Sequence, residues 1–190
     1  MKKLLPLSFS IFYLFSSPFF AQNDSIWFNS SWKETSKKDA SFYRLKPTKK
    51  GDAYYVVDYF MNGSKQMEGL SKYPGKDMFI GPITWYYENG KIFQIAYYEN
   101  GIQNGNRKVY YKNGTLKTDS NYLEGRLDGK WKAYYENGNI KETGSYNNGQ
   151  KEGHWKTYYI NGKLFESGKY VSDQKIDKWK TNYYDGSEQK

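Results

Sequence analysis

The sequence contains no cysteine and only one histidine, His154, among its 190 residues. Without cysteine the chain cannot form a disulfide framework, and it lacks the residue that a bacterial lipid anchor requires. A catalytic histidine needs an orienting partner and a nucleophile or a metal beside it, and the residues around His154 mark no such set. We therefore expect no enzymatic activity, no catalytic residue, no metal and no cofactor, with His154 on the surface.

Aliphatic residues are also scarce, whereas aromatic residues make up 20% of the chain. Such a composition cannot build a large core of leucine, isoleucine and valine. Tyrosine, phenylalanine and tryptophan suit the pleated, half-buried surface of a sheet. The composition therefore favours an all-β protein.

Negative charge is in the minority, with 20 acidic against 29 basic residues and a net charge of +9. A basic excess is one sign of nucleic-acid binding. Here the lysines are mixed with glutamates, as in Lys141-Glu142 and Lys151-Glu152, and lysine on exposed strands also prevents edge-to-edge aggregation. We expect no nucleic-acid partner.

The first 21 residues differ from the rest of the chain. Lys2 and Lys3 precede an apolar stretch over residues 4–20, and Ala21 ends it. This pattern is typical of a secretory signal peptide, so residues 1–21 are predicted to be removed from an exported protein that is periplasmic or secreted. The alternative is an uncleaved membrane anchor, because residues 4–23 carry no charge over almost the length of a membrane span.

A period of 24 residues governs most of the remaining chain. The recurring residues are Gly81, Gly105, Gly129 and Gly153; Gly90, Gly114, Gly138, Gly162 and Gly186; Tyr98, Tyr122, Tyr146 and Tyr170; and Trp131, Trp155 and Trp179. A fixed period of this size marks a repeat protein. We expect a repeat domain over 53–190, composed of a degenerate unit at 53–80, four units at 81–104, 105–128, 129–152 and 153–176, and a half unit at 177–190.

Each repeat is expected to form a β-hairpin. Asn-Gly recurs at positions 62, 89, 113, 137 and 161 between tyrosine-rich runs, and this dipeptide favours a two-residue type I′ turn. The second turn of each unit, such as the one at Asn148-Gly149, is expected to be longer. The fold class predicted is an all-β repeat solenoid, a single twisted antiparallel meander sheet of about eleven strands.

The expected turn also predicts a register. It places Tyr135 opposite Ile140, Ala133 opposite Glu142, and an indole opposite a glycine whose bare backbone it covers. The expected indole pairs are Trp131 with Gly144 and Trp155 with Gly168. The structural positions of the repeat are then Trp131, Trp155, Trp179, Gly138, Gly144, Gly162 and Gly168.

The opposite face is expected to carry two further columns of side chains. They are Tyr86, Tyr110, Tyr134 and Tyr158, and Lys108, Lys132, Lys156 and Lys180. Two strands per repeat place successive members about 10 Å apart. We interpret these eight residues as a candidate binding face, while the alternative is that they only cover the sheet, since tyrosine keeps its hydroxyl in water and lysine lays its stem along the rings.

Residues 22–52 do not follow the period and are interpreted as an N-terminal cap, because repeat arrays need atypical end units. We expect one helical turn over 35–40, with Ser36 and Asp39 spaced as a capping box. A turn is expected over 47–52, and Trp27 and Trp32 are expected to pack on the first hairpin. The alternative is a docking segment for a partner.

The pattern from Gly129 to Gly138, Gly-x-Trp-x-x-Tyr-Tyr-x-Asn-Gly, continues with Gly144-x-Tyr146-x-x-Gly149-x-x-x-Gly153. It resembles the bacterial variant of the MORN repeat, found in proteins labelled YwqK-family antitoxins. The resemblance implies one extended sheet of consecutive hairpins used for protein contacts, and in some members for phospholipid contact, with no catalytic residues. The choline-binding repeat also uses Gly-x-Trp, Tyr-Tyr and Asn-Gly, but the 24-residue, strongly charged unit is more similar to the MORN variant.

These observations predict an exported, non-enzymatic repeat protein that presents a binding surface. The leading hypothesis is interaction with a protein partner in the cell envelope. The alternatives are binding of an anionic lipid or cell-surface glycan through the tyrosine and lysine columns, and a role as the antitoxin or immunity partner of a toxin.

Overall fold

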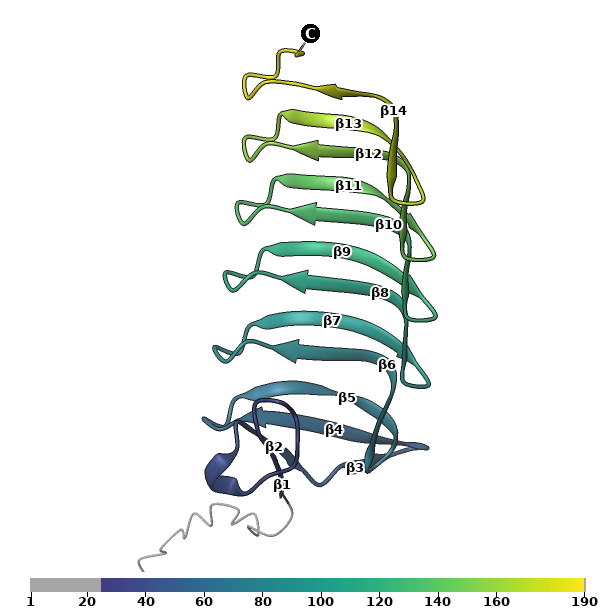
Figure 1. The fold of residues 1–190 in the computed structure, drawn as a ribbon. Helices are drawn as coiled ribbons and strands as arrows, with labels where there is room; N and C mark the ends of the chain where they lie inside the picture. The colour runs from purple at the N-terminus through teal and green to yellow at the C-terminus, as the bar shows by residue number, and fades with distance from the viewer. Residues whose placement is uncertain (1–24, 190) are drawn as a thin grey trace, which may run out of the picture.

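The computed structural model describes residues 25–189, which form one antiparallel sheet in the shape of an elongated ladder (Figure 1). The predicted signal peptide, residues 1–21, lies outside the described residues. The strands, with one 3₁₀ turn, are β1 (Ser25–Phe28), η1 (Lys37–Asp39), β2 (Phe42–Leu45), β3 (Thr48–Lys50), β4 (Ala53–Phe60), β5 (Lys65–Tyr73), β6 (Lys76–Tyr86), β7 (Ile92–Glu99), β8 (Ile102–Tyr110), β9 (Leu116–Leu123), β10 (Arg126–Tyr134), β11 (Ile140–Asn147), β12 (Gln150–Tyr158), β13 (Leu164–Val171) and β14 (Gln174–Thr181).

The strand order follows the chain without a crossover. From β4 to β14 every strand pairs antiparallel with the next, and β3 pairs with β4 beside the main path. The predicted single meander sheet is therefore confirmed, with extra strands at the N-terminal end. Among the described residues, no helix has the length and apolar character needed to cross a membrane.

The Asn-Gly turns differ from the expected type I′ turn. In the turn after β10, Gly138 N donates to Tyr135 O at 2.9 Å and Tyr135 N donates to Asn139 O at 2.8 Å. The φ of Gly138 is +89°, and Asn137 is not among the residues with positive φ. This is a three-residue loop, a type I turn closed by a glycine bulge, so the two-residue assignment was wrong.

The side chain of Asn137 explains why the type I turn forms. Its Oδ1 accepts a hydrogen bond from Asn139 N at 3.0 Å, and its Nδ2 donates to Ile160 O of the next turn at 3.2 Å. The glycine bulge also shifts the register, so that Ile140 pairs with Tyr134 instead of the expected Tyr135.

The type I′ turns lie at the other end of the hairpins, where a longer turn was expected. Asn147 pairs with Gln150, which leaves a two-residue loop. The φ angles of this loop, 50° at Asn148 and 86° at Gly149, are both positive, as a type I′ turn requires. The same positive pair occurs at Asn100-Gly101, Glu124-Gly125 and Ser172-Asp173.

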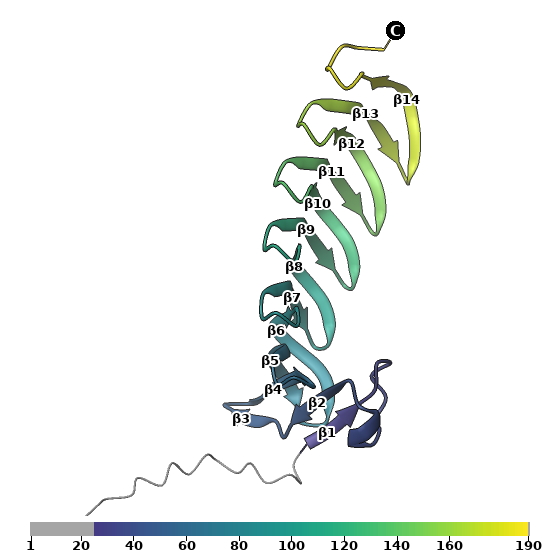
Figure 2. The ribbon, with the colours of Figure 1, turned by 90° about the vertical axis from the view of Figure 1, so that its left-hand side faces the viewer.

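A second irregularity bends each hairpin near this end (Figure 2). Thr143 pairs with Lys156 and Ser145 with Glu152. An advance of two residues along β11 therefore corresponds to four residues along β12. Gly153, with a φ of +72°, lies inside the longer segment. The repeated glycine of the sequence therefore marks a bulge that a residue with a Cβ adopts only under strain.

The tryptophan–glycine register is confirmed, because Trp131 pairs with Gly144 and Trp155 pairs with Gly168. The indole that covers each glycine, however, belongs to the next hairpin. A Cβ on Gly144 would lie 2.2 Å from the ring of Trp155, and one on Gly168 would lie 2.3 Å from the ring of Trp179. The expected cover within one hairpin was therefore wrong, and the contact joins successive repeats instead.

Side chains of the Asn-Gly turns also join successive repeats. The second tyrosine of each Tyr-Tyr pair donates its hydroxyl to a backbone carbonyl of the following repeat. These bonds, of 2.7–2.9 Å, are Tyr87 to Tyr110, Tyr111 to Tyr134, Tyr135 to Tyr158 and Tyr159 to Asn182. The Tyr-Tyr-x-Asn-Gly motif thus encodes both the turn and its link to the next turn.

The tryptophan face, defined as the face that carries Trp131, Trp155 and Trp179, provides most of the burial. In the C-terminal half, Trp131, Tyr146, Trp155, Tyr170 and Trp179 form one column in edge-to-face contact, with ring centroids 5.0–5.9 Å apart. This geometry is favourable for aromatic pairs. In the N-terminal half an aliphatic cluster of Val56, Met67 and Ile83 takes the same role.

The N-terminal cap packs against the repeats through β2. The ring of Trp27 contacts that of Tyr43 at 5.3 Å, and Trp32 stacks on Phe42 at 4.6 Å. Tyr43 and Phe42 then contact Tyr59 and Phe60 of β4. The ring contacts of the two tryptophans therefore reach the first hairpin through β2.

The expected helical turn is present as η1, but its capping box is not formed. Ser36 Oγ donates to the carboxylate of Asp39 at 2.8 Å, and no side chain caps the backbone of this turn. The segment 47–52, expected to be a turn, contains the short strand β3 and turns only at Gly51 and Asp52.

A buried ion pair ties β2 to the first hairpin. Arg44 Nε donates to Asp58 Oδ1 at 2.6 Å and Nη2 donates to Oδ2 at 2.9 Å, while Nη1 donates to Asp77 at 2.7 Å. Arg44 and Asp58 are 7% and 1% exposed. Removal of one partner would leave a buried charge unpaired, so this contact fixes the position of the cap.

Candidate anion-binding site

The lysine face, defined as the face that carries Lys108, Lys132, Lys156 and Lys180, presents a continuous row of residues across seven strands. Cross-strand pairing from β8 to β14 gives the order Lys108, Asp119, Lys132, Thr143, Lys156, Ser167, Lys180. Neighbouring strands are about 4.8 Å apart, so successive lysines of the row are about 10 Å apart. The structure therefore places the predicted lysine column in one row across the sheet.

The middle of this row lies in a depression of about 310 Å³. Its polar lining residues are Lys130, Lys132, Thr143, Ser145, His154, Lys156 and Tyr158. Three of the predicted binding residues, Lys132, Lys156 and Tyr158, thus share one shallow depression. Sequence reasoning missed Lys130, Thr143 and Ser145, which only the cross-strand pairing brings to this place.

The lysines of the two faces differ in their partners. On the tryptophan face, Lys151 pairs with Glu142 and Lys175 with Glu166, both at 2.8 Å. Their ammonium groups also lie 4.0 Å from the ring centroids of Trp155 and Trp179. Within residues 25–189, no ion pair within 4.0 Å involves Lys108, Lys132, Lys156 or Lys180.

The charge of the site therefore has one sign. No acidic side chain lines the depression, while three lysines do. Ammonium groups held by flexible stems near the hydroxyls of Thr143 and Ser145 can donate several hydrogen bonds to one oxyanion. The arrangement is suited to bind a carboxylate, phosphate or sulfate group.

The tyrosine column is divided between two roles. Tyr86 and Tyr55 both donate their hydroxyls to Glu68, which also pairs with Lys65 at 2.7 Å. Tyr110, Tyr134 and Tyr158 are half-buried, and their backbone carbonyls accept the hydrogen bonds that link the turns. Tyr86 thus belongs to an internal polar cluster, and the other three flank the lysine row.

The cluster around Glu68 shifts the ionisation of its members. Burial opposes the charge of Glu68, but hydrogen bonds from Lys65, Tyr55 and Tyr86 outweigh it and hold the pKa of Glu68 below its usual value. Burial and the hydrogen bond to Glu68 raise the pKa of Tyr55 to about 12 and also raise the pKa of Tyr86. These hydrogen bonds join β4, β5 and β6 and stabilise the first repeats.

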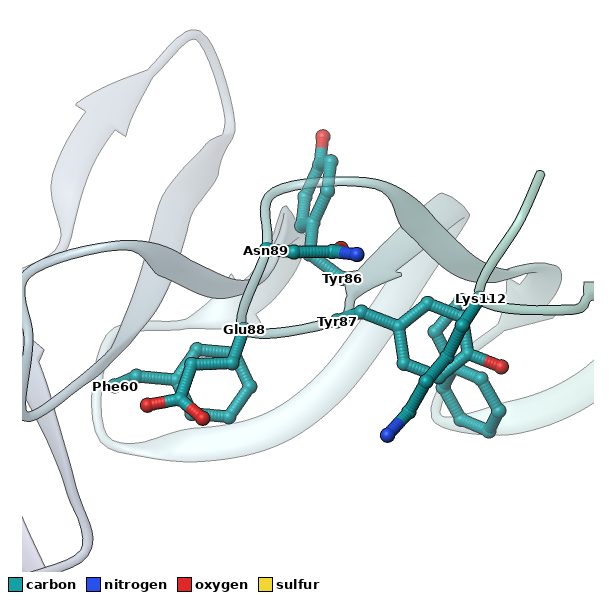
Figure 3. A pocket seen from close by; sticks show the side chains of 7 residues that line it. Phe60, Tyr86, Tyr87, Glu88, Asn89 and Lys112 are labelled. Carbon is teal, nitrogen blue, oxygen red and sulfur yellow. The ribbon is translucent and has the colours of Figure 1, made fainter.

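A larger groove of about 680 Å³ lies at the Asn-Gly turns of the first repeats (Figure 3). Phe60, Tyr87, Glu88 and Lys112 border it, and Tyr86 points to the other side of the chain. Two of its polar groups already have partners, because Tyr87 donates to Tyr110 O and Glu88 accepts from Asn62 Nδ2 at 3.2 Å. This groove is therefore a weaker candidate than the basic depression.

Among residues 25–189, no group of three or more histidine, cysteine or acidic side chains is arranged to hold a metal ion. His154 is exposed on the lysine face, where it pairs across the strands with Lys169. It lies beside lysines and hydroxyls in the lining of the depression.

The fold and the site define the class of this molecule as an all-β repeat protein built from one extended sheet of hairpins, with no catalytic family indicated. Four segments, residues 80–100, 103–124, 127–148 and 151–172, match the model of the MORN repeat variant. Each segment spans one hairpin, from β6–β7 to β12–β13, so these four hairpins are similar to the MORN repeat variant. No curated protein matches the chain.

Proposed function

We propose that this protein is an exported, non-enzymatic binding module that uses its lysine face to bind an acidic protein partner in the cell envelope. The observation that carries this proposal is the contrast between the two faces. The lysines of the tryptophan face are paired with glutamates, whereas the row from Lys108 to Lys180 has no ion pair within 4.0 Å in the described chain.

Several properties support a protein as the partner. Tyrosine is enriched at protein interfaces, and three half-buried tyrosines flank the row. A line of like charges attracts an acidic surface from a distance and selects against basic partners. Repeat sheets also present the extended surfaces that such contacts need.

A second candidate is an anionic lipid or cell-surface glycan, which the even spacing of the row favours. Weak contacts repeated along a polymer add through effective concentration. The third candidate, an antitoxin or immunity role, would use the same face against the acidic surface of a toxin.

Export rests on Lys2, Lys3 and the apolar stretch that follows them. Mass spectrometry of the protein purified from its native cells should find the N-terminus at or within a few residues of Gln22. An intact Met1 on protein extracted from membranes would support the anchor instead and would contradict secretion.

Photo-crosslinking in the native cells tests the binding proposal. A photoreactive residue replaces Lys156 on the lysine face, and the matched control replaces Lys175 on the tryptophan face. We expect discrete crosslinked species, sensitive to protease, from position 156 and none from position 175. Crosslinks from both positions alike, or from neither, would reject the lysine face as the binding surface.

A further inference from the structure

The row on the lysine face contains three junctions in which one residue lies between two lysines. The first is Lys108–Asp119–Lys132, the second Lys132–Thr143–Lys156, and the third Lys156–Ser167–Lys180. Each junction has a lysine on both sides, and only the type of the middle residue changes. It is a carboxylate in the first junction and a hydroxyl in the other two.

The first junction contains its own anion. Asp119 Oδ1 accepts a hydrogen bond from Asn106 Nδ2 at 2.7 Å, which holds the carboxylate in the row between Lys108 and Lys132. The side chains of Thr143 and Ser167 are neutral and shorter in reach. The second and third junctions therefore keep two lysines each without the carboxylate that the first junction supplies.

We infer that the Thr143 and Ser167 junctions are two receptor sites for carboxylate groups of one extended acidic segment of a protein. This inference rests on the proposed function and specifies the part of the partner that binds. At each junction an incoming carboxylate lies between the two lysines, beside Thr143 or Ser167. The flanking ammonium groups and the central hydroxyl then donate hydrogen bonds to its oxygens.

The distance between the two sites limits the conformation of the segment. Thr143 and Ser167 lie two strands apart, which is about 10 Å. A polyproline II chain repeats every three residues with a rise of about 3.1 Å each, so that side chains i and i+3 point the same way about 9.3 Å apart. A β-strand does not meet this condition, since its residues i and i+3 point to opposite faces. The sites therefore match acidic residues at every third position of a polyproline II segment.

The first of the two receptor sites lies in the shallow depression. Thr143 lines the depression of about 310 Å³ together with Lys132 and Lys156. In this site the hydroxyl of Thr143 donates a hydrogen bond directly to the bound carboxylate.

The probe is a fluorescent peptide of four Glu-Pro-Pro units, and the control peptide has the same composition with its four glutamates in one block. Binding to the full chain is measured by fluorescence anisotropy at low ionic strength. We expect the spaced peptide to bind more tightly than the block peptide, and binding to weaken as salt screens the charges.

Two kinds of variant change the junctions in opposite directions. Thr143→Asp with Ser167→Asp places a carboxylate in each receptor site and should weaken peptide binding by about tenfold or more, as expected for close charge pairs. Asp119→Asn keeps the hydrogen bond from Asn106 but removes the internal anion, so it should open a third site and strengthen binding. The control for net charge is Gln150→Asp with Gln174→Asp, two exposed positions near the type I′ turns, which should change binding much less.

Circular dichroism melting shows whether the variants fold, and Asp119→Asn tests the inference even if the double aspartate variant does not. Equal binding by the folded Thr143→Asp/Ser167→Asp variant, or no gain from Asp119→Asn, overturns the inference. Equal binding of the two peptides overturns the inferred spacing of acidic residues at every third position. Tighter binding to anionic phospholipid vesicles or to an acidic polysaccharide overturns the choice of a polypeptide as the ligand. If crosslinking from position 156 to a protein persists in these cases, the proposed function stands and only the carboxylate sites fail.

Discussion

The first two hairpins, β4 to β7, and the later repeats, β8 to β14, are the same unit of structure with different buried contacts. The residue that covers the small residue of the preceding hairpin is Ile83 in the first region and Trp155 or Trp179 in the second. Ile83 is 0% exposed and lies in an aliphatic cluster with Val56 and Met67. Trp155, at 1% exposed, lies in a column of aromatic rings instead.

Arg107 marks the change between the two regions. It lies opposite Ala96 and donates two hydrogen bonds to Gln94 Oε1, at 2.9 and 2.6 Å, and one to Tyr122 at 3.0 Å. One position of the repeat thus accepts isoleucine, arginine or tryptophan, as long as the opposite residue is small. The comparison shows that a one-sheet protein requires a covering side chain at this position but does not require a particular chemistry.

The largest expected effects come from removing the two covering side chains. Trp155→Ala should lower the free energy of unfolding by about 3–5 kcal/mol and Ile83→Ala by about 2–5 kcal/mol, because both leave cavities over a glycine. Urea unfolding of the full chain measures both. Trp131 is only half-buried, so Trp131→Ala should cost less than Trp155→Ala, and the reverse order would contradict the assignment of Trp155 as the cover.

A smaller effect tests which indole lies on Gly144. Gly144→Ala places a methyl group against the ring of Trp155 and should destabilise the protein by about 1–3 kcal/mol through overpacking. A double-mutant cycle with Trp155→Phe should show coupling of about 0.5 kcal/mol or more, because the residues are in contact. The same cycle with Trp131→Phe is the control. Stronger coupling there would show that Trp131, which belongs to the same hairpin as Gly144, covers this glycine.

The link between turns is expected to contribute less again. Tyr135→Phe removes the hydrogen bond to Tyr158 O, at 2.7 Å, and should cost about 0.5–1.5 kcal/mol. Tyr134→Phe is the matched control, because no hydrogen bond of its hydroxyl is present in the described chain. Thermal melting of both variants measures the difference, and equal losses would show that the link does not stabilise the turns.

The smallest effect concerns the first region alone and depends on pH. The folded-state pKa of Glu68 lies below its ordinary value of 4.5, so its contribution to stability is complete above that pH and is lost as the pH falls through the lower pKa. Glu68→Gln should flatten the acid side of the stability profile, measured by urea unfolding between neutral and acid pH. Glu166→Gln, in the later repeats, serves as the comparison, and an equal flattening there would show that the two regions do not differ.

Much of this arrangement could be predicted from the sequence because its signals are local. Trp131 and Gly144 were placed opposite each other by counting from the turn, and the lysine column followed from the period and the alternation of side chains. The prediction placed the type I′ turn at the wrong end of each hairpin, because Asn-Gly is compatible with both a type I′ turn and a type I turn with a glycine bulge. The hydrogen bond from Asn137 to the next turn favours the second form, and the dipeptide itself contains no sign of that neighbour.

The sequence by itself thus determined the period, the order of the hairpins and the face on which Lys132 and Lys156 lie, because these depend on residue spacing along the chain. Only the tertiary structure decided that Trp155 covers Gly144 and that Thr143 lies between Lys132 and Lys156. Both contacts join a hairpin to the next one, across a bulge at Gly153 that changes how many residues of one strand face the other. The register between β11 and β12 is set by backbone hydrogen bonds between successive repeats. The spacing of residues within a single repeat does not specify this register.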